Sequence, residues 1–216
     1  DLGNRPKGMN LRKALVVSQF VIALVLITAT FSVYRQITFM KNYDLGFDLE
    51  QVMVVSIPRI RDESFNESVI SFKEELRRQS QVKKLCVVTE VPGRQIIWDN
   101  GGIRRAGEDA GKGKNYQIVG IDYEFVDVLN LKIVQGRNFS KDFPADKNAL
   151  ILNETAVKTM GFTSNEEAVG KLVDYWGELY PIVGVIADYH QQSLKAAFEP
   201  HIYLSLIHIS EPTRPY

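Results

Sequence analysis

Cysteine is nearly absent from the sequence, since Cys86 is the only one among 216 residues. The chain therefore cannot form an internal disulfide, and this leaves its redox compartment open in both directions. Histidine is scarce as well, with three residues, and the formal net charge is zero. A chain without an excess of Lys and Arg lacks the basic face that nucleic-acid binding requires. These shortages exclude a disulfide-rich scaffold and argue against a nucleic-acid-binding protein.

One stretch, residues 14–34, lacks charge, proline and glycine altogether, and Gln19 is its only strongly polar residue. A helix of this length covers about 30 Å, which is the thickness of the hydrocarbon core of a bilayer. Apolar residues occupy every face, whereas a buried core helix is rarely apolar all round for so long. The stretch predicts a transmembrane helix. We expect a stalk that continues to Tyr43, with Gly46 as the helix C-cap.

Lysine and arginine flank this stretch unevenly. Residues 1–13 hold four of them against one Asp, whereas Arg35 and Lys41 are the cations just beyond the other end. Such residues favour the cytoplasmic side, so residues 1–13 are predicted to be cytoplasmic and the part after Tyr34 outside. A cleaved signal peptide is the alternative. It would have a shorter apolar core and an Ala-x-Ala-like site, and neither feature fits.

Residues 48–203 alternate strand and helix patterns, which predicts an α+β domain outside the membrane. Its first part contains two apolar, β-branched runs, residues 52–57 and 82–89, separated by a helical pattern. That helix is expected to begin at Ser64, which forms a capping box with Glu67. Strand, helix and strand together predict a β-α-β unit.

Residues 90–115 differ in composition from the rest of the domain, because six glycines lie there among basic residues. This favours solvated strands and hairpins in an inserted part of the domain, and the alternative is a contact surface for a substrate or partner. Asn153 and Gly161 are expected to cap a helix over residues 154–160. Further strands are expected at residues 116–121, 131–134, 149–152, 180–188 and 201–204.

Residue types that perform catalysis or bind metals do not gather at recognisable spacings. His190 and His201 have no cysteine partner and no metal-ligand spacing, so a metal site is not expected. Asp188 and His190 could be drawn as an acid–base pair, but the sequence gives that pair little support. Ser56 and Ser193 lack a nucleophile-elbow pattern. We therefore predict no catalytic residue, no metal and no cofactor, and the chain is not expected to be an enzyme.

Other short motifs are weak. The segment GKGK at residues 111–114 lacks the spacing of a phosphate-binding loop, so no nucleotide site is predicted. Asn66, Asn138 and Asn153 begin triplets that match the N-glycosylation pattern, which is frequent by chance.

Several segments together resemble the ABC transporter permeases of the MacB/FtsX type in their order and spacing. They are Leu11–Phe20, Tyr43–Phe47, Gly136–Phe139, Leu152–Thr155, Glu167–Lys171 and Ile182–His190. The resemblance covers nearly all of residues 11–203 and is closest to the second half of a two-repeat permease. It implies a bacterial inner-membrane subunit with a periplasmic core domain. That domain would consist of a porter-like β-α-β subdomain and an inserted, strand-rich subdomain that includes residues 90–115.

The resemblance also implies how such a subunit works. A separate cytoplasmic ATPase would supply the energy, and the membrane helices would pass its motion to the periplasmic domain, a process called mechanotransmission. A permease dimer or pseudo-dimer and a periplasmic or outer-membrane partner are implied as well. The resemblance transfers no substrate.

The sequence departs from this family after Tyr203, where three more spans would follow. Residues 204–216, LSLIHISEPTRPY, resemble the translation of a sequencing adapter, and we expect them not to be native. The alternative function is a single-pass membrane sensor or ligand-binding ectodomain, which needs neither further spans nor an ATPase. A membrane-anchored hydrolase would need a polar pocket, for instance around Asp188 and His190.

Overall fold

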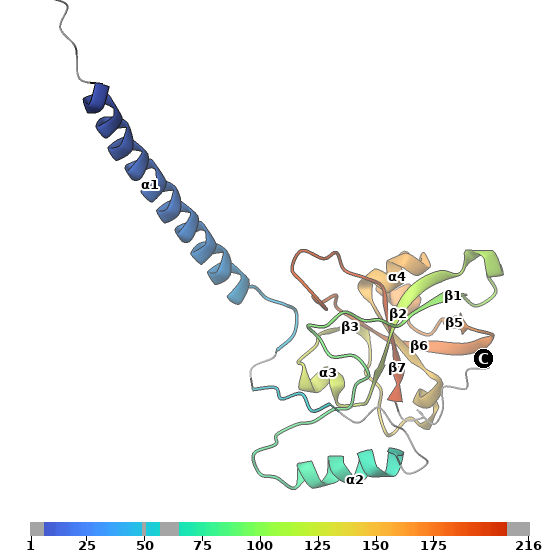
Figure 1. Cartoon of the computed structure of the whole chain (residues 1–216). Helices are drawn as coiled ribbons and strands as arrows, with labels where there is room; N and C mark the ends of the chain where they lie inside the picture. Colours follow the sequence, from blue (N-terminus) through green and yellow to red (C-terminus); the bar gives the residue numbers. More distant parts are fainter. Residues whose placement is uncertain (1–6, 49–50, 57–64, 207–216) are drawn as a thin grey trace, which may run out of the picture. The chain divides into compact units, whose positions relative to one another are not determined.

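The computed structural model of the chain describes residues 7–48, 51–56 and 65–206. It divides into two compact units, Asp1–Asp44 and Leu45–Tyr216. The first unit is built on the helix α1, Lys7–Lys41, and the second contains the strands and the other helices (Figure 1).

Helix α1 is uninterrupted over 35 residues, which makes it about 50 Å long. Within it, Leu11–Lys41 is long and apolar enough to cross a membrane. The hydroxyls of Ser18, Thr28 and Thr30 each donate to a backbone carbonyl one turn earlier, so these polar groups are satisfied inside the helix. The predicted helix is confirmed, and its continuation is confirmed as far as Lys41. Gly46 is not its C-cap, because the helix ends before it.

The described part of the second unit contains seven strands in the order β3-β6-β4-β7-β2-β1-β5. Their bounds are β1 Asp99–Arg105, β2 Lys114–Ile121, β3 Ile133–Gly136, β4 Leu150–Asn153, β5 Leu172–Tyr175, β6 Glu178–Ile186 and β7 His201–Ser205. The strand pattern after residue 115 predicted β2, β3, β4, β6 and β7 to within a few residues. The α+β fold class is thus confirmed.

The strand pairings form a closed circuit. Strand β1 pairs with β2 and, through Arg104 and Arg105, with β5. Strand β5 pairs with β6, β6 runs parallel to β4, and β4 is antiparallel to β7. Strand β7 returns to β2 in parallel and closes the circuit, while β3 extends the sheet beside the C-terminal half of β6.

Alternating side chains of the central strands pack into two separate hydrophobic cores. On β4, Ile151 belongs to one core, and Leu150 and Leu152 belong to the other. On β7, Tyr203 and Ile202 divide in the same way. Helix α3, Phe125–Val128, covers the first core, and helices α4, Glu154–Met160, and α5, Asn165–Ala168, cover the second.

Helix α4 follows its predicted caps. The Asn153 side chain accepts a hydrogen bond from Ala156 N, and Gly161 ends the helix in the left-handed conformation with φ of 85°. The two helices α4 and α5 lie in the connection between the parallel strands β4 and β6, which makes this connection the β-α-β crossover of the domain.

The predicted β-α-β unit over residues 52–89 is wrong in its strands. Residues 52–56 form no strand, and Val52–Val55 are exposed, because no neighbouring strand pairs with them. Residues 82–89 form a single bridge, Val88 with Ile121. Ser64 and the rest of residues 57–64 lie outside the described residues.

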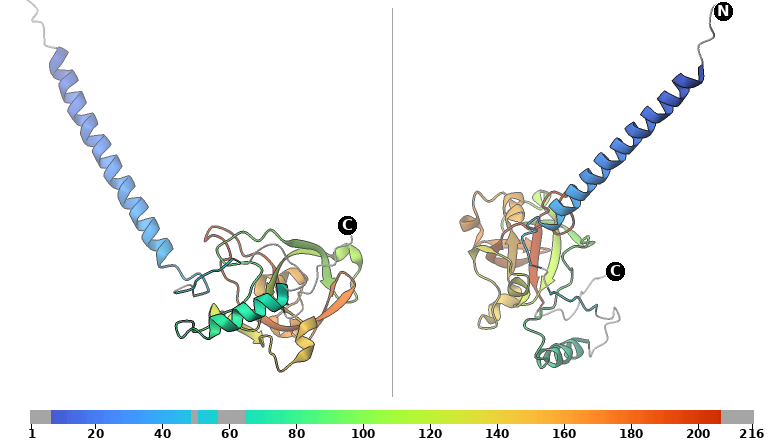
Figure 2. Two further views of the ribbon diagram at one scale, coloured as in Figure 1. Left: turned by 60° about the horizontal axis from the view of Figure 1, so that its bottom comes forward. Right: turned by 90° about the vertical axis from the view of Figure 1, so that its left-hand side faces the viewer.

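The helix between these segments is present as α2, Phe65–Arg77. It lies at the margin of the domain in Figures 1 and 2, and its Ile70 and Phe72 are exposed. Charged contacts attach it: Lys73 Nζ lies 2.5 Å from carboxylate oxygens of both Asp122 and Glu124. Burial alone would raise the pKa of Glu124, but the contacts with Lys73 outweigh it and hold that pKa below its ordinary value.

The predicted hairpin in residues 90–115 is confirmed as β1 and the start of β2. Both strands belong to the closed circuit. The division of the domain into a porter-like part and an insert stays a prediction. Strand β7 includes Leu204 and Ser205 of the segment attributed to an adapter, and residues 207–216 lie outside the described residues.

Candidate functional site: the entry joint

The segment that follows α1 docks on the loop between β6 and β7. We call the contacts between residues 45–48 and residues 188–200 the entry joint. His190 N donates to Leu45 O at 3.0 Å, and Asp48 N donates to Leu129 O at 2.9 Å. The Phe47 ring meets the Tyr189 ring edge-on, with centroids 5.5 Å apart. Two of the segments that resemble the permease family, residues 43–47 and 182–190, thus touch one another.

Gly46 has two reasons to be glycine in this joint. Its φ is 82°, a left-handed conformation that residues with a Cβ rarely adopt. A Cβ placed there would lie 3.0 Å from Tyr189 Cβ and 3.2 Å from Tyr189 Cα. The glycine therefore permits the close approach of the two segments. Its position after the helix had suggested a C-cap instead.

The start of the 188–200 loop is fastened to α4. Asp188 accepts hydrogen bonds from Thr155 N at 3.0 Å and from Thr155 Oγ1 at 2.8 Å. Its own backbone N donates to Glu154 Oε2 at 3.3 Å. Asp188 thus supports the N-terminus of the helix, where a negative charge is favourable.

The end of the loop is fastened to the same helix through Asn153. Its Oδ1 accepts from Ala156 N at 2.9 Å and from His201 N at 2.8 Å. Its Nδ2 donates to Glu199 O at 2.8 Å and lies 3.3 Å from His201 Nδ1. One buried amide therefore joins β4, α4, the loop and β7, and all four of its contacts are with groups on the protein.

The Asn153 amide also bears on the tautomer of His201. We assign Nδ1 of His201 as the acceptor and place the ring proton on Nε2, because Nδ2 of Asn153 is a donor. His201 is 2% exposed, and its Nε2 has no hydrogen-bond partner among the described residues. The ring lies nearly parallel to Tyr189 and to Tyr203, with centroids 6.2 and 6.1 Å away. Burial lowers the pKa of His201 to about 4, so the ring is neutral.

Gln191 of the loop is hydrogen-bonded to residues 91–94. Gln191 Nε2 donates to Val91 O and to Arg94 O, each at 3.1 Å. Gly93 N donates to Gln191 O at 2.7 Å. The rings of His190 and Phe198 close the loop on itself, with centroids 4.7 Å apart. The loop is therefore held to the rest of the domain at residues 188–191 and again at its end.

The structure places the residues considered for catalysis in structural roles. Asp188 accepts from Thr155 and supports α4, while the His190 ring contacts Phe198 and its backbone N donates to Leu45 O. His201 lies in a buried strand, and Asn153 is a buried cap. No group of three or more His, Cys, Asp or Glu suited to a metal occurs among the described residues.

A second polar cluster holds the connection between β3 and β4. Arg137 donates to both carboxylate oxygens of Asp146, at 2.6 and 2.8 Å, and Ser140 N donates to the same group at 3.0 Å. The Arg137 guanidinium also lies 4.1 Å from the Phe143 ring centroid. Burial would raise the pKa of Asp146, but the hydrogen bonds from Arg137 and Ser140 outweigh it and lower that pKa.

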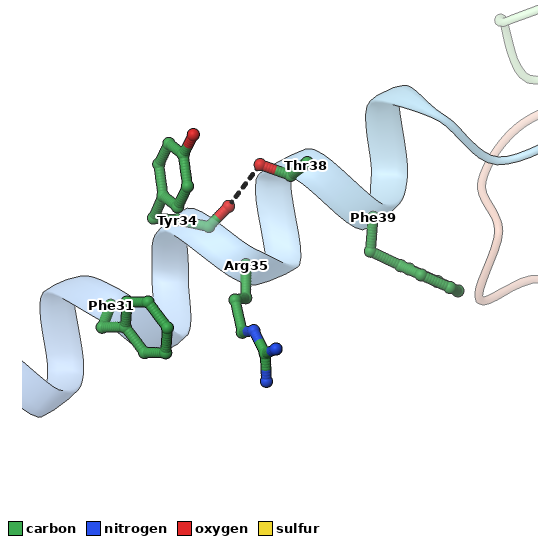
Figure 3. A pocket seen from close by; sticks show the side chains of 5 residues that line it. All are labelled: Phe31, Tyr34, Arg35, Thr38 and Phe39. Carbon is green, nitrogen blue, oxygen red and sulfur yellow. Dashed lines mark hydrogen bonds between the residues drawn. The ribbon is translucent and has the colours of Figure 1, made fainter.

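The hollow drawn in Figure 3 lies on α1 and is lined by side chains of that helix alone. Thr38 Oγ1 donates to Tyr34 O at 2.9 Å, and the Arg35 guanidinium lies 5.4 Å from the Phe31 ring centroid. Aromatic residues with an arginine at the end of an apolar helix are typical of a membrane–water interface. These residues therefore indicate where the predicted span ends.

Comparison with known proteins gives a family match. Residues 14–213 match the family described as the MacB-like periplasmic core domain. The periplasmic region of MacB from Actinobacillus actinomycetemcomitans is similar at 23% identity with a TM-score of 0.42, over 63% of this chain and 54% of that one. The extracellular domain of the noncanonic ABC-type transporter YknZ from Gram-positive bacteria is similar at 19% identity with a TM-score of 0.44, over 62% and 60%. No curated protein matches the chain.

Proposed function

The chain belongs to the family of MacB-like periplasmic core domains, and from this premise we propose that it converts ATP hydrolysis by a separate cytoplasmic ATPase into movement of its outer domain. The observation that carries the proposal is the extent of the family match, residues 14–213, which includes both the apolar helix and the described domain. The movement would serve the export or extraction of a substrate. The catalytic step itself would take place in the ATPase partner.

The entry joint supplies a path for such movement. Helix α1 has neither proline nor glycine between Ala14 and Lys41, so it lacks the residues that commonly kink a helix. The chain continues from α1 to Leu45, whose carbonyl is bonded to the 188–200 loop. That loop is fastened to α4 and to β7, so a pull on residues 45–48 reaches both cores of the domain.

The proposed location has the N-terminus in the cytoplasm and the domain in the periplasm, with the chain anchored in the inner membrane. Thiol labelling tests it, because Cys86 is the only native cysteine. In a Cys86→Ser background, Lys112→Cys should react with a membrane-impermeant maleimide in intact spheroplasts, and Lys13→Cys should react only after lysis. The reverse pattern would overturn the orientation.

The coupling itself requires the complete permease and its ATPase. The first step is to read the native DNA beyond the codon for Tyr203, where three further spans and a neighbouring ATPase gene are expected. A stop codon there without an ATPase gene would favour the single-pass sensor. With the ATPase, spin labels on Lys41→Cys and Lys112→Cys should change their separation on addition of Mg-ATP. An unchanged distance, or the same change with a hydrolysis-deficient ATPase, would contradict coupling to hydrolysis.

A further inference from the structure

His201 occupies a position at which a proton would disturb the contacts between Asn153 and the end of the 188–200 loop. Its neutral ring accepts from Asn153 at Nδ1, and its backbone N donates to the same side chain. Its ring lies nearly parallel to that of Tyr189, which contacts Phe47, and to that of Tyr203, which belongs to the core, with centroids 6.2 and 6.1 Å away. A change in the charge of this one ring therefore acts on the loop, on α4 and on the docked segment together.

We propose that the entry joint is an acid-sensitive latch, in which protonation of His201 releases the 188–200 loop from Asn153 and loosens residues 45–48. A protonated ring carries N–H groups on both nitrogens, so Nδ1 would then oppose the donor Nδ2 of Asn153. Asn153 cannot simply rotate its amide, because its Oδ1 already serves Ala156 N and His201 N. Relief requires the loop to move.

No carboxylate is hydrogen-bonded to the His201 ring among the described residues, and the backbone of Glu199, which favours the protonated ring, does not offset the lowering of its pKa by burial. Asp188 is bonded to Thr155, and the Glu154 carboxylate accepts from Asp188 N. The Glu199 carboxylate accepts from the Gln117 side chain. Each of these carboxylates is therefore engaged with a group other than the His201 ring.

The two tyrosines beside the ring are not anions either. Burial raises the pKa of Tyr189 to about 12, and burial also raises that of Tyr203 well above its ordinary value. On its own loop, His190 contacts Phe198, and Nε2 of His201 has no partner among the described residues. The closed latch thus excludes the proton, whereas an open loop would expose the ring to water.

The size of the effect follows from the difference in proton affinity. The pKa of His201 is about 4 in the closed latch, and an exposed histidine has a pKa of about 6.5. The equilibrium constant for opening should then rise about tenfold per pH unit below pH 6.5, or about 30-fold at pH 5. This window lies above the pH range in which ordinary carboxylates titrate.

Hydrogen exchange measured by mass spectrometry on the full chain in detergent micelles tests the latch. After correction for intrinsic exchange rates, protection in residues 188–200 and at residues 45–48 should fall about 30-fold between pH 7.5 and pH 5. Protection in β1 and β5, which make no strand pairing with β7, should stay constant. His201→Gln should make residues 188–200 insensitive to pH, while His190→Gln, the matched control, should keep the full response.

Three outcomes would overturn the proposal: constant protection in the unmodified chain, a loss that spreads equally to β1 and β5, or a response that survives in His201→Gln. If His201→Gln fails to fold, the ¹H–¹³C signals of the unmodified histidines decide. A His201 signal that titrates near pH 6.5 in the folded chain would refute the latch. The latch depends only on contacts within the domain, and a role in transport would rest on the proposed function. A failure of ATP coupling would therefore leave the exchange result standing.

Discussion

Removing the Asn153 side chain should destabilise the domain more than the loss of an ordinary helix cap. Asn153→Ala deletes the cap of α4, which accepts from Ala156 N at 2.9 Å, and such a loss costs about 0.5–2 kcal/mol. It also leaves His201 N and Glu199 O without their bonds to this side chain, and Asn153 is 2% exposed. Each buried group left unsatisfied costs about 1–3 kcal/mol.

The contacts share one side chain, so these costs do not add fully, and we expect a loss of about 3 kcal/mol. For a domain of this size the melting temperature should fall by about 6–12 °C. Urea unfolding followed by tryptophan fluorescence measures the loss, because Trp98 and Trp176 both lie in the domain and α1 contains no tryptophan.

Thr155→Val is the matched control. It removes the bond from Oγ1 to Asp188 but keeps the backbone bond of Thr155 N to the same carboxylate. Its cost should be about 1 kcal/mol. If Asn153→Ala costs no more than Thr155→Val, Asn153 does not join the four elements as argued, and the entry joint is held by other contacts.

Three further perturbations test other parts of the structure. Asp146→Asn should cost about 2 kcal/mol in urea unfolding, below the roughly 3–5 kcal/mol for a fully buried pair because Arg137 is 40% exposed. Because the folded-state pKa of Asp146 is lowered, its contribution to stability is complete above about pH 4 and is lost as pH falls through that pKa. Between neutral pH and acid, Asp146→Asn should therefore lose less stability than the unmodified chain. Gly184→Ala should cost at least about 1–3 kcal/mol, because a Cβ there would lie 2.2 Å from Arg137 O, and an unchanged urea midpoint would contradict this contact. Leu24→Arg should raise the free energy of membrane insertion by about 2.5–3.5 kcal/mol in a translocon assay, and a water-soluble unmodified chain would refute the span itself.

Local signals predicted the elements that are governed by local physics. Asn153 and Gly161 cap α4 as expected, because a cap depends on residues within one turn. The apolar run of β6 was recognisable as well. Residues 52–57 carry the same kind of pattern, yet their described part forms no strand, because a strand also needs a partner that the local sequence does not specify.

The entry joint could be predicted only in part. Its segments stood out through their resemblance to the permease family, but their contact was not foreseeable. The contact of Thr155 with Asp188 spans 33 residues, and that of Asn153 with His201 spans 48. Sequence spacing therefore does not reveal that His201 is buried beside Tyr189 and Tyr203. The single available signal is its position within the apolar, β-branched run of β7.

The closed circuit of strands also lowers the tendency of the domain to aggregate through its strand edges. An open sheet presents unpaired backbone groups at two edges, and these recruit strands from other chains. Here six strands each have at least two partner strands, and β3 is the one described strand with a single partner. The circuit therefore reduces the unpaired strand edge of the described domain, and the strand with a single partner, β3, is only four residues long.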